Sequence, residues 1–139
     1  MSDWNQQIID EFRANGGRVG GQFTGASLIL LHHRGRRSGR EFVAPLAYQP
    51  VEGRDDAILV VASMAGAPVH PEWYHNLLAA GKAQVETGTE TYEATVRDLP
   101  GAERDEAFER IVARFPGFRD YERKTAGIRT IPVLELTRA

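Results

Sequence analysis

The stretch from Leu28 to Pro45 constrains the fold most, because it combines two strand-like runs with a basic turn between them. Leu28 to Leu31 form an apolar run typical of a buried strand. Residues His32 to Arg40 interrupt that run with two glycines and four arginines, and Phe42 to Tyr48 resume an extended pattern. We predict a β-hairpin whose tip carries an anion site.

The chemistry of this tip suits a phosphate. Gly35 and Gly39 can adopt positive φ and leave backbone N–H groups pointing outward, Arg36 and Arg37 supply forked donors, and Ser38 adds a hydroxyl. The alternative is a solvated basic turn that only keeps a sheet edge from pairing with another chain. Neither a Walker loop nor a Rossmann fingerprint is present, so a phosphate would bind at a strand-to-strand turn.

Composition favours one domain spanning residues 1–139, with an N-terminal helix over residues 1–15. The chain has 139 residues, 42% of them hydrophobic, which is enough for a single core. A formal charge of -2 argues against a general nucleic-acid partner. The absence of cysteine excludes disulfides and thiolate metal sites, and we expect no metal.

The N-terminus has no basic segment followed by an apolar one, and no run approaches the roughly 20 apolar residues of a membrane span. We therefore expect a cytoplasmic protein without an integral membrane segment. The sequence leaves a homodimer open.

The first element is predicted to be a short amphipathic helix. Asp3 is placed as its N-cap, and Gly16-Gly17 end it. Trp4, Ile8, Ile9 and Phe12 fall on one face and are expected to cover a barrel end or sheet edge. The glycine-rich segment from Gly16 to Gly25 is expected to be a loop without chemistry.

After the hairpin we predict a turn over Pro50 to Asp56 and an apolar strand over Ala57 to Ser63. Small residues follow this strand. They would let a flat ligand approach the backbone, with Ser63 and the N–H groups of Ala65 and Gly66 as donors. A routine strand-to-helix connection explains the same residues.

A helix is predicted to begin near Pro71 and to end at Gly81, with its N-terminus favourable for an anion. Trp73 and Leu77 lie one turn apart and are expected in the core. Asn76, between them, either faces solvent or hydrogen-bonds a specific partner.

The rest of the chain predicts a mainly β protein. A hairpin covers Ala83 to Val96, a helix carries Ala107 to Phe115, a short helical piece includes Phe118 to Arg123, and Ile131 to Leu136 form a closing strand. Without regular β-α alternation, about six strands and short helices favour an antiparallel barrel over a doubly wound sheet.

Four motifs coincide in order and spacing with those of a known family. They are Gly35-Arg36-Arg37-Ser38-Gly39 with Pro45-Leu46, Val61-Ala62-Ser63 with Gly66, the run His70 to Leu77, and Phe115-Pro116-Gly117-Phe118 with Asp120-Tyr121 before Ile131-Pro132-Val133. From about Leu28 on, the chain resembles the deazaflavin-dependent nitroreductase family, within the flavin/deazaflavin oxidoreductases of split β-barrel (FMN-binding-like) fold.

The resemblance implies an enzyme that binds coenzyme F420, found chiefly in actinobacteria and some archaea, in a groove at the barrel mouth. Matching positions imply four groups of cofactor-binding residues. They are Arg36, Arg37 and Ser38 at the phosphate; Phe42, Val43, Ala44, Pro45, Leu46 and Ala47 beside the cofactor; Val61, Ala62, Ser63 and Met64 under the ring; and Trp73, Tyr74, His75 and Asn76 at the helix start.

The resemblance also implies a substrate pocket walled by Phe115, Phe118 and Tyr121, with Tyr121 orienting or protonating the acceptor. Relatives often carry three tyrosines here, an arginine at Phe42 and a lysine at Met64. The implied reaction is hydride transfer from F420 to a small conjugated, nitro or quinone-type acceptor, and the phenylalanines favour an enone or quinone.

Three alternatives remain open at this point. The basic turn could hold the phosphate or propionate of FMN, FAD, heme or another tetrapyrrole. The loss of two tyrosines would suit a non-catalytic F420 carrier. The four arginines alone would suggest a nucleic-acid role, which predicts steeply salt-dependent binding.

Overall fold

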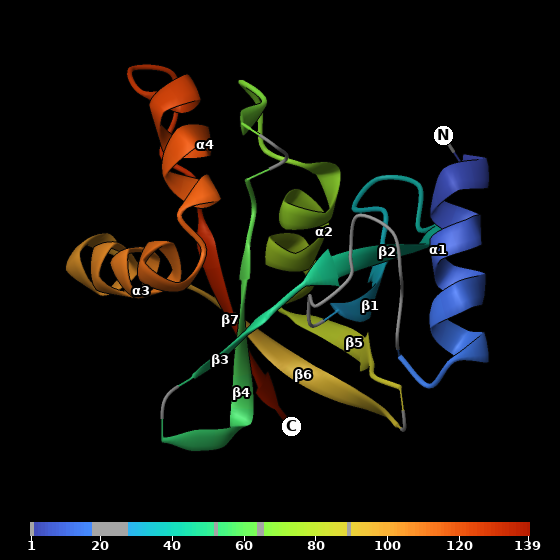
Figure 1. The fold of residues 1–139 in the computed structure, drawn as a ribbon. Helices are drawn as coiled ribbons and strands as arrows, with labels where there is room; N and C mark the ends of the chain where they lie inside the picture. Colours follow the sequence, from blue (N-terminus) through green and yellow to red (C-terminus); the bar gives the residue numbers. More distant parts are fainter. Residues whose placement is uncertain (1, 18–27, 52, 64–65, 89) are drawn as a thin grey trace.

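Seven antiparallel strands and four helices make up the described part of the chain in the computed structural model, which covers residues 2–17, 28–51, 53–63, 66–88 and 90–139 (Figure 1). In chain order the elements are α1 Ser2–Ala14, β1 Leu28–Arg34, β2 Glu41–Ala47, β3 Gln49–Val51, β4 Arg54–Val61, α2 Glu72–Ala80, β5 Lys82–Glu86, β6 Thr91–Asp98, α3 Gly101–Arg114, α4 Gly117–Thr125 and β7 Val133–Arg138.

The sheet has the order β2-β1-β5-β6-β7-β4-β3. Its two outermost strands, β2 and β3, are consecutive in sequence and are separated only by Tyr48. A single stretch of chain therefore runs from one edge of the sheet to the other and curls it into a barrel (Figure 1). The predicted antiparallel split barrel is confirmed.

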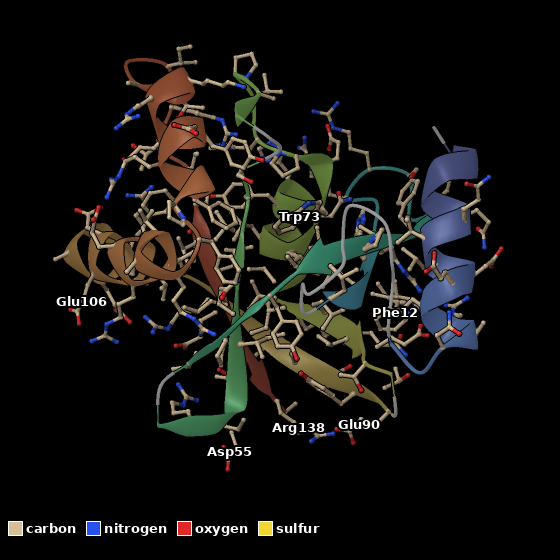
Figure 2. All side chains as sticks on the ribbon, viewed as in Figure 1. Phe12, Asp55, Trp73, Glu90, Glu106 and Arg138 are labelled. Carbon is tan, nitrogen blue, oxygen red and sulfur yellow. The ribbon has the colours of Figure 1, made fainter. Side chains whose placement is uncertain are left out.

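Strand β1 is apolar on both faces because both faces are covered. Ile29 and Leu31 belong to the cluster inside the barrel, whereas Leu28 and Leu30 pack outside it against α1. Phe12 of α1 is 1% exposed and points toward the strands (Figure 2). This two-sided burial explains why the run shows no alternation.

The opposite outer face of the barrel is covered by α3 and α4 (Figure 1). Phe108 and Ile111 of α3 pack with Leu59 and Val133 in a second cluster, while Val60 and Leu134, the chain neighbours of those strand residues, face the inner one. Burial on both sides again follows the two-residue period of a strand.

Helix α2 closes one end of the barrel. Trp73 and Leu77 lie in the inner cluster, as predicted (Figure 2). Gly81 ends the helix in the left-handed conformation, with φ of 73° and its N–H bonded to Leu77 O at 2.8 Å. Pro71 precedes the first helical residue, so both predicted boundaries are confirmed.

Several predicted boundaries were wrong. Strand β1 continues through His32, His33 and Arg34, because they pair with Val43, Phe42 and Glu41 across the hairpin. The predicted turn over Pro50 to Asp56 is mostly strand, since Pro50 pairs with Ile58 and Val51 with Arg54. Asp3 lies inside α1, which begins at Ser2. The closing strand begins at Val133 and not at Ile131.

Some predictions fall on residues outside the described ranges. These are the glycine-rich segment beyond Gly17, Met64 and Ala65, and the side chain of Trp4. Among the described residues, no helix has the length and apolar character needed to cross a membrane.

We expect Gly88→Ala to destabilise the packing of α1 against the barrel. A Cβ at Gly88 would lie 1.7 Å from Gly16 O, so the backbone at one of these two residues must shift. The free energy of unfolding should fall by about 1–3 kcal/mol in urea denaturation, as for other overpacked sites. Gly117→Ala is the control, because a Cβ there meets nothing within 4 Å. Equal stability of the two variants would contradict the close approach.

Candidate functional site

The basic turn between β1 and β2 is closed by its own backbone. Gly35 N–H donates to Arg40 O at 2.8 Å, and Gly39 N–H donates to Gly35 O at 2.9 Å. The Ser38 hydroxyl oxygen accepts the Arg40 N–H at 3.2 Å. Gly39 has φ of +73°, and a Cβ at Gly35 would lie 2.6 Å from Ser38 Oγ. The predicted positive φ is therefore found at Gly39 and not at Gly35, whose missing Cβ instead leaves room for the Ser38 hydroxyl.

One buried amide attaches the turn to α2. Asn76 is 4% exposed, its Oδ1 accepts the Arg36 N–H at 3.0 Å, and its Nδ2 lies 2.9 Å from His33 Nδ1. The Nδ2 group can only donate, so His33 Nδ1 is the acceptor. Burial lowers the pKa of His33, and the neighbouring His32 lowers it further, which favours this neutral form. Asn76 thus has specific partners and does not face solvent.

The turn and α2 enclose a cavity of about 350 Å³. Five of the residues assigned to the cofactor line it together. They are Arg36, Arg37, Ser38, Phe42 and Asn76. His33, Gly35 and Glu72 complete the lining.

The charge of this cavity is mainly cationic. Arg36 is 3.8 Å from Glu72, a long and exposed ion pair. Arg37 has no carboxylate within ion-pair distance among the described residues. The Phe42 ring stacks on His33, with centroids 5.4 Å apart, and the Arg40 guanidinium lies 5.6 Å from its centre. The cavity therefore offers guanidinium and hydroxyl donors beside an aromatic wall.

Strand β2, which carries Phe42 to Ala47, hydrogen-bonds a neighbouring strand on one side only within the described chain. The other edge leaves backbone groups open to a ligand, except at Pro45, which has no N–H. Leu46 packs against the inner cluster and Val43 against the cluster under α1. Contact with a ligand by these two residues would be mainly through the backbone.

The segment after β4 is held by Arg129, a residue that sequence reasoning missed. Its guanidinium donates to Ala62 O at 3.1 Å, to Ser63 O at 2.9 Å and to Ala67 O at 3.0 Å, and it lies 2.9 Å from His70 Nδ1. Burial lowers the pKa of Arg129. Three backbone carbonyls are thereby satisfied within the protein. The prediction of the Gly66 N–H as a ligand donor was wrong, because this group donates to Ser63 O at 2.9 Å.

Side chains in this segment point mostly into the protein. Ala62 is fully buried and Ser63 is 9% exposed, so a ligand would meet them chiefly through the backbone. Val61 is partly buried and packs on the cluster under α3. Met64 lies outside the described residues.

Helix α4 lies directly against Gly66, the first described residue after Ser63. A Cβ at Gly66 would be 3.4 Å from Tyr121 Cα and 2.8 Å from Lys124 Cδ. Phe118 and Tyr121 form an edge-to-face pair with centroids 5.8 Å apart, and both are partly buried on the cluster under α3. Phe115 is 42% exposed. The backbone of Tyr121 therefore lies beside Gly66.

The remaining residues assigned at the start of α2 have protein partners. Trp73 belongs to the core. The Tyr74 hydroxyl donates to Asp98 Oδ2 at 2.6 Å, and burial together with this bond raises the pKa of Tyr74 to about 12. His75 packs edge-on against Tyr74, with centroids 5.4 Å apart.

Comparison with known proteins now bears on this arrangement. The family model described as F420H(2)-dependent quinone reductase matches residues 4–138. The chain belongs to this family. It is 34% identical over 132 residues to an F420H(2)-dependent quinone reductase of Mycobacterium tuberculosis, covering 91% of this chain and 85% of that protein.

Two solved structures are similar to this chain. The F420-H2-dependent reductase FDR-A is 32% identical, with a TM-score of 0.66, covering 78% of this chain and 92% of that one. A protein described as a domain-swapped dimer is 28% identical, with a TM-score of 0.69, covering 97% and 98% of the two chains.

Membership of the family confirms the resemblance drawn from the sequence, and with it an oxidoreductase that uses coenzyme F420. The family's description names quinones, whereas the resemblance in sequence is to deazaflavin-dependent nitroreductases.

We expect Asn76→Ala to lower the free energy of unfolding by about 1–3 kcal/mol, because it leaves the Arg36 N–H and His33 Nδ1 without partners. Urea denaturation measures the change. Glu72→Gln is the matched control on the same helix, since its exposed 3.8 Å pair with Arg36 contributes little. If Asn76→Ala is as stable as the control, the amide does not hold the turn.

Proposed function

We propose that this chain transfers hydride from reduced F420 to a small conjugated acceptor of the quinone type. The observation that supports this best is the cavity of about 350 Å³ in which the basic turn faces α2, since it joins donors for an anion to an aromatic wall. Enones fall within the same proposal. Nitro compounds are the less favoured acceptors, because Phe115 and Phe118 stand where relatives often carry tyrosine.

The cavity fits the anionic part of the coenzyme. Arg36 and Arg37 present forked donors, and the Ser38 hydroxyl, whose oxygen already accepts the Arg40 N–H, still has a proton to donate. We assign these three side chains to the phosphate. Asn76 acts through the turn and is a positioning residue.

The planar part of the coenzyme is assigned to the space between the open edge of β2 and the segment that follows β4. Arg129 holds the carbonyls of Ala62, Ser63 and Ala67. The N–H groups of Ala62 and Gly66 donate to Pro132 O at 3.0 Å and to Ser63 O at 2.9 Å, so these described backbone groups form a wall for the ring and not a set of free donors. Arg129 is therefore a second positioning residue. A guanidinium without a carboxylate partner among the described residues also makes this region cationic.

When bound, the reduced coenzyme supplies the hydride, and the chain supplies binding, orientation and exclusion of water. The backbone of Tyr121 lies beside Gly66, and of the three residues assigned to the acceptor pocket Tyr121 alone carries a hydroxyl, which is our candidate donor of a proton to the acceptor oxygen. Phe115 and Phe118 are assigned to the wall of the acceptor pocket.

A homodimer is part of this proposal. It is supported by the similar structure described as a domain-swapped dimer, whose alignment with this chain is nearly complete. Sedimentation equilibrium would show the mass of one chain if the dimer does not form.

We expect oxidised F420 to bind with quenching of its fluorescence, and Arg37→Ala to weaken binding roughly 10- to 100-fold. This is the loss of a charge-assisted hydrogen bond to phosphate, about 1.5–3 kcal/mol. Arg34→Ala is the control on the same hairpin, because Arg34 pairs with Glu41 at 2.9 Å and does not line the cavity. Absence of quenching at micromolar protein would remove the proposal, and bound visible colour as purified would favour flavin or heme instead.

We expect Tyr121→Phe to lower kcat for reduction of a water-soluble benzoquinone by about 100-fold or more while leaving the Kd of F420 unchanged, as for loss of a general acid. Stopped-flow oxidation of reduced F420 measures the rate. Tyr92→Phe on β6 is the control, because Tyr92 does not line the cavity at the basic turn. Tight F420 binding without hydride transfer to any quinone or enone would identify the chain as a carrier.

A further inference from the structure

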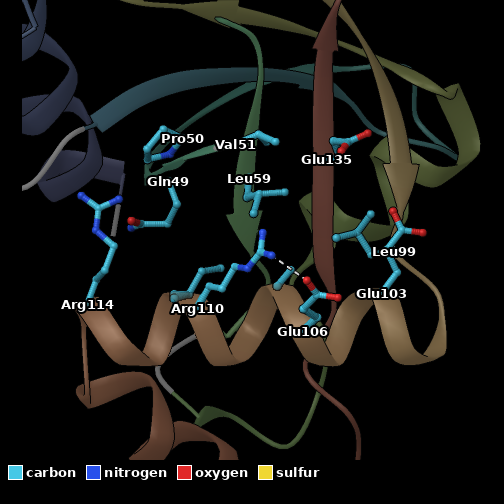
Figure 3. Close-up of a pocket in the computed structure, with 12 residues that line it drawn as sticks. Gln49, Pro50, Val51, Leu59, Leu99, Glu103, Glu106, Arg110, Arg114 and Glu135 are labelled. Carbon is cyan, nitrogen blue, oxygen red and sulfur yellow. Dashed lines mark hydrogen bonds and ion pairs between the residues drawn. The ribbon is translucent and has the colours of Figure 1, made fainter. Parts of the chain in front are cut away.

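A second cavity, of about 490 Å³, opens between α3 and the outer face of β3, β4 and β7 (Figure 3). None of its lining residues belongs to the cavity at the basic turn. Its volume is in the range of sites for small organic ligands. The proposed F420 reaction makes no use of it.

The floor of this cavity is apolar. Leu59 of β4, Leu99 before α3 and Ile111 of α3 line it and belong to the buried cluster beneath α3, and Val51 of β3 packs on the same cluster. Such a surface favours binding of a hydrocarbon group, because the contact removes apolar surface of both the ligand and the protein from water.

One polar group within the cavity lacks a partner. The side chain of Gln49, the first residue of β3, is 7% exposed, lines the cavity, and makes no hydrogen bond to another described residue. Every fully buried polar side-chain atom of the described residues has a hydrogen-bond partner. Because the Gln49 amide has none, its atoms are not fully buried and reach the cavity surface. Figure 3 shows it extending from the strand toward α3. An amide in this position is available to a ligand.

The carboxylates of the cavity are already neutralised. The pairs are Glu106 with Arg110 at 2.6 Å, Glu135 with Arg97 at 3.3 Å and with Arg54 at 3.5 Å, and Glu103 with Arg97. Arg114, near the end of α3, has no carboxylate partner among the described residues and lies on the same side of the cavity as Gln49 (Figure 3). That end of the cavity is therefore cationic.

We propose that this cavity binds an amphiphilic carboxylic acid. Its hydrocarbon body lies on Leu59, Leu99 and Ile111, and its carboxylate lies between the Gln49 amide and the Arg114 guanidinium. Both groups are hydrogen-bond donors, and guanidinium matches the two oxygens of a carboxylate. A cationic head is disfavoured, because no carboxylate of the cavity is left without its arginine.

Calorimetric titration of the full chain with decanoate, below its micellar concentration, tests this site. We expect one molecule to bind per chain, at least tenfold more tightly than decanol, and decyltrimethylammonium not to bind. Equal affinity for decanoate and decanol, or preference for the cation, would overturn the proposed head-group contacts, and absence of decanoate binding would overturn the site.

Two variants locate the head group. Arg114→Gln changes an exposed side chain and should weaken decanoate about tenfold while leaving decanol unchanged. Gln49→Leu should also weaken decanoate selectively. Arg123→Gln on α4 is the matched control, because Arg123 pairs with Asp120 at 3.4 Å and does not line the cavity. Unchanged decanoate affinity in both cavity variants would refute the site, whether or not F420 binds.

Discussion

The fold depends on one continuous stretch, Glu41 to Val51, that forms both edges of the sheet and so closes the barrel. Its first part borders the cavity at the basic turn through Phe42, and its last part borders the second cavity through Gln49 and Val51. Because side chains alternate along a strand, a shift of register by one residue would reverse which of them face the core. Barrel closure and both cavities therefore rely on the same pairing of β2 with β1 and of β3 with β4.

Two polar side chains hold loops that lie outside the helices and strands. Asn76 connects the turn after β1 to α2, and Arg129 connects the segment after β4 to the chain between α4 and β7. Each satisfies backbone or ring groups that would otherwise be unpaired in a partly buried place, which is costly. The Asn76 amide and the Arg129 guanidinium each bond several groups at once. They therefore hold these loops in one conformation without a larger hydrophobic core.

Local patterns in the sequence predicted the barrel, the hairpin and the ends of α2, because strand runs, Pro71 and Gly81 act over a few residues. The strand over residues 54–56 was missed, since Pro50, Gly53 and two aspartates resemble a turn, whereas Val51 pairs with Arg54 and β4 begins there. Asn76 was recognised as a polar residue beside core residues, but its partners lie about 40 residues earlier. Nothing in the sequence distinguishes Arg129, whose partners lie 59 to 67 residues away.

Whether an arginine is paired with a carboxylate is a better guide to the proposed anion sites than the number of arginines. The formal charge is only -2, and arginines such as Arg13, Arg97, Arg119 and Arg138 are neutralised by neighbouring carboxylates. Among the described residues, Arg37 and Arg114 line cavities without such a partner. An exposed ion pair adds little stability, but it does remove a guanidinium from competition for ligands. Arg37 and Arg114 are thereby left for the two anionic ligands that we propose, and neither arginine is apparent from the net charge.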